Sequence, residues 1–291
     1  MTARIEHAIA VDGLRLRAVE RGPRRGTPVV ILHGFTGSSQ AMSGVARALP
    51  SRWSICLDLV GHGRSDAPRE VGPYRMRRCV RQVVGAMDAL GVSRGHLLGY
   101  SMGGRVALHV CVTHPRRVAS ALVVGTGAGI ADPEQRRARV GDDEALADAI
   151  LRDGVPTFVD RWMAHPLFAS QRRLGPGALA EARVQRLRNR GHGLANSLRG
   201  MGAGAQEPLH QRLASLTVPV CLAVGDEDAK FRAIGADLAN RMPRGRLAII
   251  EKAGHAVHLE NPDAFGDLVE SFLREVEAEL PRHVTQEDTP T

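Results

Sequence analysis

Three stretches of the chain place a serine, an aspartate and a histidine directly after apolar runs that are typical of buried strands. Ser101 lies in the pattern Gly-x-Ser-x-Gly over residues 99–103, whereas Asp228 and His255 each follow a later apolar run. A serine hydroxyl is a poor nucleophile or base near neutral pH, so a neighbouring imidazole must accept its proton. A carboxylate must then hold the other nitrogen of that imidazole. These residue types in this order predict a catalytic triad of Ser101, Asp228 and His255.

The two glycines around Ser101 predict a tight strand-to-helix turn. An apolar run enters the pattern and a helical pattern leaves it, and Gly99 and Gly103 leave room where a β-carbon would clash. Ser101 would then stand at the N-terminus of a helix, where free N–H groups favour nearby negative charge. The pattern by itself also fits an ordinary glycine-rich turn. Its strand and helix flanks favour the functional interpretation.

Two neighbouring residues compete for the roles of Asp228 and His255. Asp226 follows its strand immediately and is suited to bracing the loop, whereas Asp228 lies further out, where its side chain can reach over to the histidine. His258 competes with His255, but His255 lies closer to the end of its strand. On these grounds the sequence favours Asp228 and His255.

Apolar runs alternate with helical patterns through most of the chain. The predicted strands span 14–19, 28–32, 53–58, the run before Ser101, 118–124, 218–224 and 246–250; the predicted helices span 39–49, 77–90, the pattern after Ser101, 232–241 and 262–280. Such alternation predicts an α/β fold with a mostly parallel central sheet flanked by helices. The order of Ser101, Asp228 and His255 along the chain is the order found in the α/β-hydrolase fold.

One long stretch interrupts this alternation. Residues 129–213 carry helical patterns, many arginines and no convincing strand. A helical insert at this point is expected to cap the carboxyl ends of the strands, where such sheets bind ligands. The predicted organisation is therefore a first part of the core over 1–128, a cap over 129–213, a second part of the core over 214–280 and a disordered tail over 281–291.

The sequence His33-Gly34-Phe35 follows the second predicted strand. In the α/β-hydrolase fold, the loop at this place supplies one backbone N–H of an oxyanion hole, and the residue after the serine supplies the other. These residues are Phe35 and Met102 here. A plain tight turn would also account for the His-Gly pair.

The positive charge of the chain comes from arginine. The formal net charge is +8 over 291 residues, and lysine occurs only at Lys230 and Lys252. Because the arginines are dispersed and aromatic residues make up 3% of the chain, nucleic-acid binding is not indicated. We instead expect a small anionic substrate.

Several other classes of protein are disfavoured. No stretch approaches the ~20 apolar residues of a membrane span, and the N-terminus lacks the apolar core of a signal peptide, so we expect a cytoplasmic protein without a membrane partner. The histidines and cysteines have no metal-binding spacing, and neither a metal nor an organic cofactor is expected. Widely spaced cysteines predict buried free thiols, at Cys56, Cys79, Cys111 and Cys221.

Three motifs carry a narrower resemblance. They are Gly-Tyr-Ser-Met-Gly-Gly-Arg over 99–105, Trp-Met-Ala-His-Pro-Leu-Phe-Ala-Ser over 162–170 and Asp-Ala-Lys-Phe over 228–231. The chain resembles the α/β-hydrolase superfamily over nearly its whole length, and more narrowly the MenH family, the 2-succinyl-6-hydroxy-2,4-cyclohexadiene-1-carboxylate synthases of menaquinone biosynthesis. This resemblance implies a carbon–oxygen lyase that eliminates pyruvate from an enolpyruvyl cyclohexene carboxylate. It also implies a set of substrate-binding residues: Tyr100, Arg105, Arg139, Trp162 and Arg188.

The position of Arg105 supports this implication on chemical grounds. It lies four residues after Ser101, one helical turn along and near the serine's side of the helix. A substrate with three carboxylates needs fixed cations, and the planar guanidinium suits a carboxylate. Two other hypotheses remain: a hydrolase of carboxylic esters or carbon–carbon bonds with the same triad, and a fold member that binds a ligand without catalysis.

Overall fold

One mixed β-sheet organises the computed structural model, which describes residues 4–279; the predicted tail over 281–291 lies outside this range. Its strand order is β1-β2-β4-β3-β5-β6-β7-β8. The bounds are β1 Arg4–Val11, β2 Leu14–Arg21, β3 Val29–Leu32, β4 Ser54–Leu57, β5 Gly95–Tyr100, β6 Val118–Val124, β7 Val220–Gly225 and β8 Gly245–Ile250. Strand β2 is antiparallel to β1 and β4, and the other pairs are parallel. The predicted α/β-hydrolase type of sheet is confirmed.

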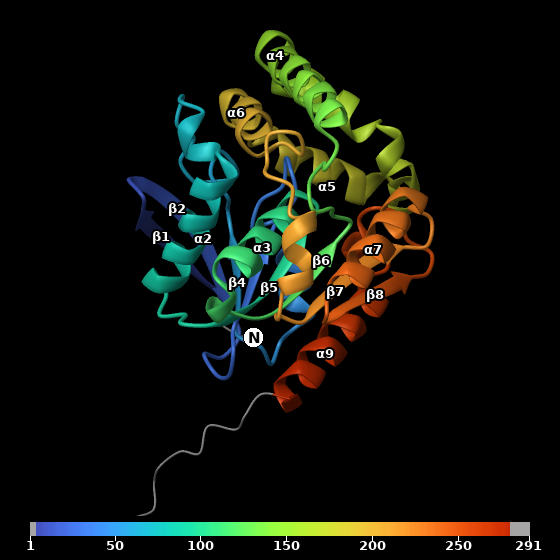
Figure 1. Ribbon diagram of the computed structural model, residues 1–291. Coiled ribbons are helices and arrows are strands. Elements are labelled where there is room, and N and C mark those ends of the chain that lie inside the picture. Colours follow the sequence, from blue (N-terminus) through green and yellow to red (C-terminus); the bar gives the residue numbers. More distant parts are fainter. Residues whose placement is uncertain (1–3, 280–291) are drawn as a thin grey trace, which may run out of the picture.

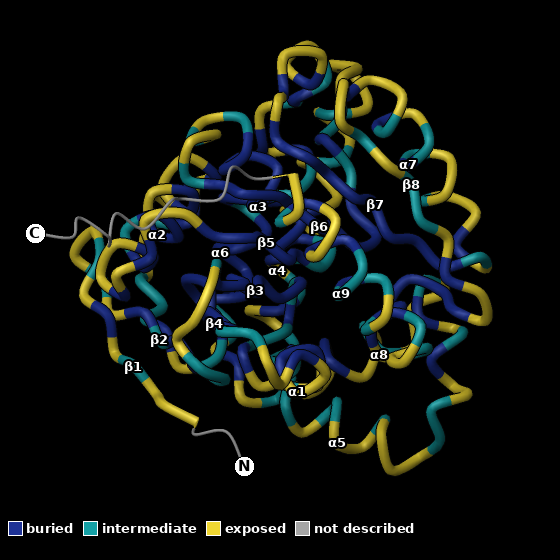
Figure 2. The backbone as a smooth tube through the Cα atoms, turned by 90° about the horizontal axis from the view of Figure 1, so that it is seen from below, coloured by how far each residue is buried: buried dark blue, intermediate teal, exposed yellow. Residues whose placement is uncertain are grey.

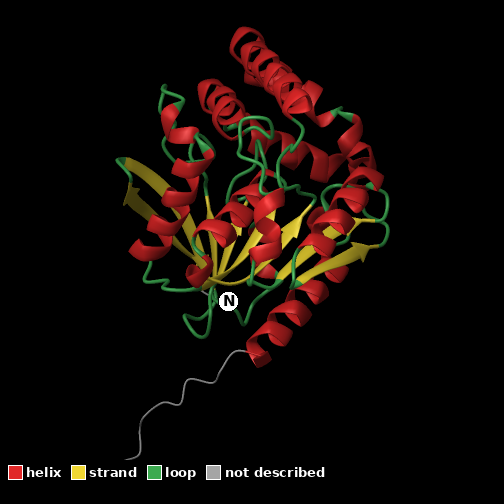
Figure 3. Ribbon diagram, in the orientation of Figure 1, coloured by secondary structure: helices red, strands yellow, loops and turns green. Residues whose placement is uncertain are grey.

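Helices cover both faces of the sheet (Figures 1 and 3). They are α1 Ser43–Arg47, α2 Met76–Ala89, α3 Met102–Thr113, α7 Ala229–Arg241, α8 Val257–Glu260 and α9 Pro262–Glu279. Side chains of β3 alternate between two cores: Val30 and Leu32 pack with α2 and α3, and Val29 and Ile31 pack with α1 and α9. A strand buried on both faces must be apolar throughout, which explains the continuous apolar runs of the sequence.

A helical insert connects β6 to β7. It contains α4 Pro133–Met163, α5 Gly175–Leu187 and α6 Gly191–Met201, together with the 3₁₀ segments η3 Pro166–Leu174 and η4 His210–Ser215. Helix α4 bends at Gly154, whose φ of 80° is not helical, just before Pro156. Figure 1 shows α4, α5 and α6 at one end of the sheet. As predicted, residues 129–213 contain no strand.

Two sequence predictions for the N-terminal half need correction. Strand β1 was not predicted; it lies at the edge of the sheet and is largely exposed, with Ile9 as its one buried residue (Figure 2). The helix predicted over 39–49 is shorter, since only Ser43–Arg47 is α-helical. The N–H of Ser39 donates to the buried carboxylate of Asp58, and this contact holds the preceding segment in turns. The remaining short 3₁₀ segments are η1 Gly72–Tyr74 and η2 Pro115–Arg117.

The four cysteines are buried free thiols, as predicted. Burial raises the pKa of Cys56, Cys79 and Cys111 to about 12 each. A thiol with such a pKa stays protonated at neutral pH and is a poor nucleophile. The cysteines therefore serve as small core residues.

Candidate active site

The backbone of Ser101 is strained at the turn between β5 and α3. Its φ of 50° and ψ of −106° lie outside the regions that side-chain-bearing residues favour. A β-carbon on Gly99 would lie 2.5 Å from the carbonyl oxygen of Gly103, and one on Gly103 would lie 2.3 Å from that of Leu32. The two glycines of the motif are therefore sterically required, as the sequence pattern predicts. Thr126 Oγ1 donates to the carbonyl of Ser101 at 2.8 Å and supports the turn.

The three polar residues singled out from the sequence form one hydrogen-bonded line. His255 Nε2 is 3.3 Å from Ser101 Oγ, and His255 Nδ1 is 2.9 Å from Asp228 Oδ2. His255 and Asp228 are both buried. In this arrangement the carboxylate holds one imidazole nitrogen and leaves the other to exchange a proton with the serine hydroxyl.

The two competing aspartates have different contacts. Asp226 Oδ1 accepts from the N–H of Ala253 at 3.0 Å, which lowers its pKa and fastens the loop that carries His255. Asp228 is the N-cap of α7, where its Oδ1 accepts from the N–H of Phe231 at 3.1 Å while Oδ2 faces His255. Asp226 therefore binds the loop, and Asp228 is the aspartate that contacts His255, as the sequence favoured.

His258 does not contact Ser101. Its ring lies 4.6 Å from that of Tyr100, between centroids, and burial lowers the pKa of His258 to about 3. The Tyr100 ring also packs 5.4 Å from the ring of His255. His258 is therefore a neutral core residue that packs against Tyr100, next to the Ser101–His255 pair.

A cavity of about 730 Å³ opens beside the Ser101 hydroxyl, between the sheet and the helical insert. Its volume is within the range of small-molecule sites. The site residues predicted from the sequence that line it are Phe35, Tyr100, Ser101, Met102, Arg105, Arg139, Trp162 and His255. Lys230, Phe231 and Phe168 line it as well.

Phe35 connects the sheet to the helical insert at this cavity. Its ring lies edge-on to Trp162, with centroids 5.3 Å apart and planes at 88°, and also contacts Phe158 of α4. Within residues 4–279 the backbone N–H groups of Phe35 and Met102 have no hydrogen-bond acceptor. Both are therefore available to a ligand in the cavity.

Comparison with known proteins places the chain in a family. The sequence profile of the α/β hydrolase fold matches residues 27–262. A protein of Bacillus subtilis (strain 168), provisionally named 2-succinyl-6-hydroxy-2,4-cyclohexadiene-1-carboxylate synthase, is 42% identical over 91% of this chain and 97% of its own length. The synthase of Serratia proteamaculans (strain 568) is 31% identical over 89% of this chain and 98% of its own. The chain belongs to the MenH synthase family of the α/β hydrolase fold.

Solved structures agree with this membership of the MenH family. The structure of MenH from S. aureus matches with a TM-score of 0.85 and 28% identity, covering 89% of this chain and 98% of that one. The enol-lactonase from Burkholderia xenovorans LB400 matches with a TM-score of 0.81 and 25% identity, covering 92% and 100%. The resemblance stated from the three motifs is confirmed, and the fold and relatives identify an enzyme.

Two arginines of this MenH-family chain reach the cavity. Arg105 is half-buried against α6, where its Nη2 donates to the carbonyl of Met201 at 2.8 Å; its Nε is buried and finds no partner in residues 4–279. Burial lowers the pKa of Arg105 to about 10, so the guanidinium remains charged at neutral pH. Arg139 Nε donates to Asp143 Oδ1 at 2.9 Å, one turn along α4. Burial raises the pKa of Asp143.

The structure does not bring Arg188 to the cavity. Its side chain is exposed, and its Nη1 donates to Gln40 Oε1 at 2.6 Å. The end of α5 explains this difference from the expectation, because Arg188 is the C-cap residue of that helix and its side chain is exposed. Sequence reasoning missed Asp143, which lines the cavity. The spacing of four between Arg139 and Asp143 is the signal that would have found it.

Neither a metal centre nor a membrane span emerges among residues 4–279. No group of three or more histidine, cysteine, aspartate or glutamate residues is arranged there to hold a metal ion. No helix in the same range is long and apolar enough to cross a bilayer.

Proposed function

We propose that this chain eliminates pyruvate from 2-succinyl-5-enolpyruvyl-6-hydroxy-3-cyclohexene-1-carboxylate to give 2-succinyl-6-hydroxy-2,4-cyclohexadiene-1-carboxylate, a step of menaquinone biosynthesis. The observation that carries the proposal is the half-buried guanidinium of Arg105, with its buried and unpartnered Nε, in the same cavity as Ser101. A cavity that partly shields a guanidinium from water suits an anionic substrate, because a partly desolvated cation gains more from a carboxylate than an exposed one does. Two relatives above 30% identity carry the name of this synthase.

The reaction begins with proton abstraction. The carbon-bound hydrogen next to the succinyl ketone is the acidic one, and Ser101 Oγ takes it as His255 Nε2 accepts the hydroxyl proton. Asp228 stabilises the imidazolium that forms, through the 2.9 Å contact to Nδ1. His255 can take both parts in this step because it lies between the other two residues, with Nε2 at Ser101 and Nδ1 at Asp228.

Negative charge then develops on the ketone oxygen. The N–H groups of Phe35 and Met102 are the donors proposed to receive it, and each such donor typically lowers the barrier by about 3 kcal/mol. The electron pair moves through the ring as the bond to the enolpyruvyl oxygen breaks, and the ring gains its second double bond. The imidazolium of His255 returns the proton, and the enol leaves as pyruvate. No water, acyl-enzyme, metal or organic cofactor takes part.

Arg105 and Arg139 are the proposed carboxylate-binding residues. Arg105 lies on α3 and Arg139 on α4, so the two cations hold the substrate between the sheet and the helical insert. Tyr100 and Trp162 supply apolar walls for the ring. Arg188 is omitted from this set because its side chain lies outside the cavity.

A hydrolase is the second candidate, because the contact between Ser101 Oγ and His255 Nε2 serves acyl transfer equally well. It requires an acyl-Ser101 intermediate and a water molecule. The decisive experiment measures pyruvate release and diene absorbance with the purified protein, beside a panel of activated esters. We expect diene formation that Ser101→Ala abolishes and that Ser215→Ala, an exposed serine, leaves unchanged. A burst of alcohol from an ester without diene formation would contradict the lyase proposal.

A further inference from the structure

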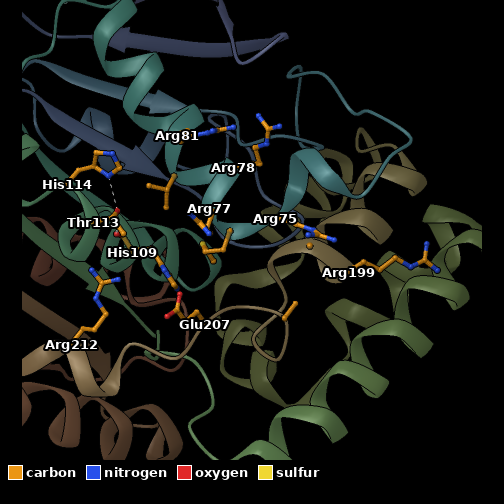
Figure 4. Close-up of a pocket in the computed structure, with 14 residues that line it drawn as sticks. Arg75, Arg77, Arg78, Arg81, His109, Thr113, His114, Arg199, Glu207 and Arg212 are labelled. Carbon is orange, nitrogen blue, oxygen red and sulfur yellow. Dashed lines mark hydrogen bonds between the residues drawn. The ribbon is translucent and has the colours of Figure 1, made fainter.

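A second cavity, of about 960 Å³, lies outside the candidate active site (Figure 4). In the described part of the chain, residues 4–279, no residue lines both cavities. Helices α3 and α6 separate them: Arg105 and Met201 face the first cavity, whereas His109 and Arg199 face the second. We call the second one the arginine cavity, after the residues that line it: Arg75, Arg77, Arg78, Arg81, Arg199 and Arg212.

Carboxylates compensate only part of this positive charge. Arg78 and Arg81 share Asp12, at 2.7 and 3.4 Å. Arg199 pairs with Glu144 and Asp148, at 2.7 and 2.5 Å. Within residues 4–279, no ion pair involves the other three arginines, Arg75, Arg77 and Arg212. Glu207 is the one acidic residue that lines the cavity in this range.

The N-terminus of α2 adds to the positive potential. Arg75 is its N-cap residue and Arg77 and Arg78 belong to its first turn, which holds no acidic residue and receives no side-chain cap. Helix N-termini carry partial positive charge and favour anions. Arginines at this end repel both the helix dipole and one another. A bound anion would remove that repulsion.

A buried histidine, His109, also lines the arginine cavity. The imidazole of His109 is 6% exposed, and its Nε2 is buried without a partner among residues 4–279. Burial and the nearby guanidinium of Arg105 lower its pKa to about 4, so the ring is neutral at pH 7. Buried polar atoms normally have a hydrogen-bond partner. Figure 4 shows His109 in the middle of the cavity wall, near Glu207.

We propose that the arginine cavity binds a small molecule with two or more linked phosphate groups, such as inorganic tripolyphosphate or a nucleoside triphosphate. The uncompensated cations come from the N-terminus of α2 and from η4, so a ligand with more than one anionic group can pair with cations of both elements. Linked phosphates carry up to two negative charges each and offer several acceptor oxygens to the guanidinium forks. Among residues 4–279, no phenylalanine, tyrosine or tryptophan lines the cavity to stack on a base, so the site recognises the phosphate chain.

Isothermal titration calorimetry at low ionic strength tests the proposal. The titrants are tripolyphosphate, ATP, GTP and citrate. We expect the three phosphate compounds to bind the wild-type protein, and citrate to bind at least about tenfold more weakly, because its carboxylates carry less charge per group. A nucleotide that binds more than about tenfold better than tripolyphosphate would identify nucleotides as the source of the phosphate chain. Citrate binding as tight as that of tripolyphosphate would overturn the phosphate assignment.

A pair of matched variants locates the binding. In Arg75→Gln/Arg77→Gln, which removes two uncompensated charges, the affinity for tripolyphosphate should fall by at least about tenfold. Arg25→Gln/Arg137→Gln removes the same charge from exposed positions outside both cavities. This control should change the affinity for tripolyphosphate by less than about twofold. An equal loss in both double variants, or no binding by the wild-type protein at millimolar tripolyphosphate, would overturn the proposal.

The candidate active site is also cationic and needs its own control. Arg139→Gln should leave the affinity for tripolyphosphate unchanged, since Arg139 lines the other cavity. A loss of binding in Arg139→Gln alone would assign the anion to the candidate active site and overturn the proposal. Circular dichroism of each variant confirms folding, so this test is independent of any enzymatic activity.

Discussion

Oδ2 of Asp228 lies 2.9 Å from Nδ1 of His255, and both side chains are buried. The other carboxylate oxygen of Asp228 caps α7. One residue thus fixes the start of a helix and the orientation of the imidazole. The start of α7 therefore holds the carboxylate of Asp228 in place, and that carboxylate orients the imidazole of His255 towards Ser101.

Asp228→Asn should lower kcat by about 10²- to 10⁴-fold, because an amide favours the wrong imidazole tautomer and does not stabilise the imidazolium. Its carbonyl oxygen still accepts from the N–H of Phe231, so the protein should fold. The matched control is Asp226→Asn, which loosens the loop of His255 and should reduce kcat less than about tenfold. Steady-state pyruvate release measures both. A larger loss in Asp226→Asn would contradict the assignment of Asp228.

Ser101→Gly should be more stable than Ser101→Ala by about 1–2 kcal/mol. Both variants lack the hydroxyl, but alanine retains the unfavourable backbone conformation at φ 50° that glycine adopts freely. For a chain of this size the difference corresponds to a melting temperature higher by about 2–4 °C per kcal/mol. Differential scanning calorimetry provides the measurement, and equal melting temperatures would show that the turn stores no strain.

Arg105→Gln should reduce kcat/KM for the enolpyruvyl substrate by about 10- to 150-fold, because a charge-assisted hydrogen bond to a carboxylate is worth about 1.5–3 kcal/mol. Arg188→Gln is the matched control, since its exposed side chain contacts Gln40 instead of the cavity. We expect it to retain wild-type kinetics. The reverse result would mean that the insert closes over the substrate and carries Arg188 inward.

Glu277 links the end of α9 to the sheet. A hydrogen bond from His96, together with the ion pair to Arg52, lowers the pKa of Glu277 to about 2. A carboxyl whose pKa is depressed in the folded state stabilises the protein above its unfolded pKa, near 4.5, and that stability is lost as the pH falls towards 2. Since the side chain is 30% exposed, we expect about 1–2 kcal/mol at pH 7 after solvent screening.

Urea denaturation of Glu277→Gln should therefore show this destabilisation at pH 7. The difference from the wild-type protein should narrow between pH 4.5 and pH 2. Glu275→Gln, an exposed position on the same helix, should show little change at either pH. A pH-independent difference between Glu277→Gln and wild type would mean that packing, and not ionisation, accounts for the effect.

The sequence predicted the site best where chemistry requires a local pattern. The Gly-x-Ser-x-Gly turn, the residues after β7 and β8, and the apolar strands follow from sterics and burial that act over a few residues. Edge strand β1 was missed because Ile9 is its one buried residue, so burial imposes little pattern on its sequence. The outward direction of the Arg188 side chain could not be predicted, because it depends on where α5 ends.

By itself, the sequence determined the α/β-hydrolase fold, the order Ser101, Asp228, His255 and the glycines that permit the strained turn. Only the tertiary structure decided which arginines face the Ser101 cavity, and it alone assembled the arginine cavity from α2, α3, α6 and η4. The physical reason is that strand and turn signals are local, whereas the direction of a long charged side chain on a helix depends on what packs against that helix.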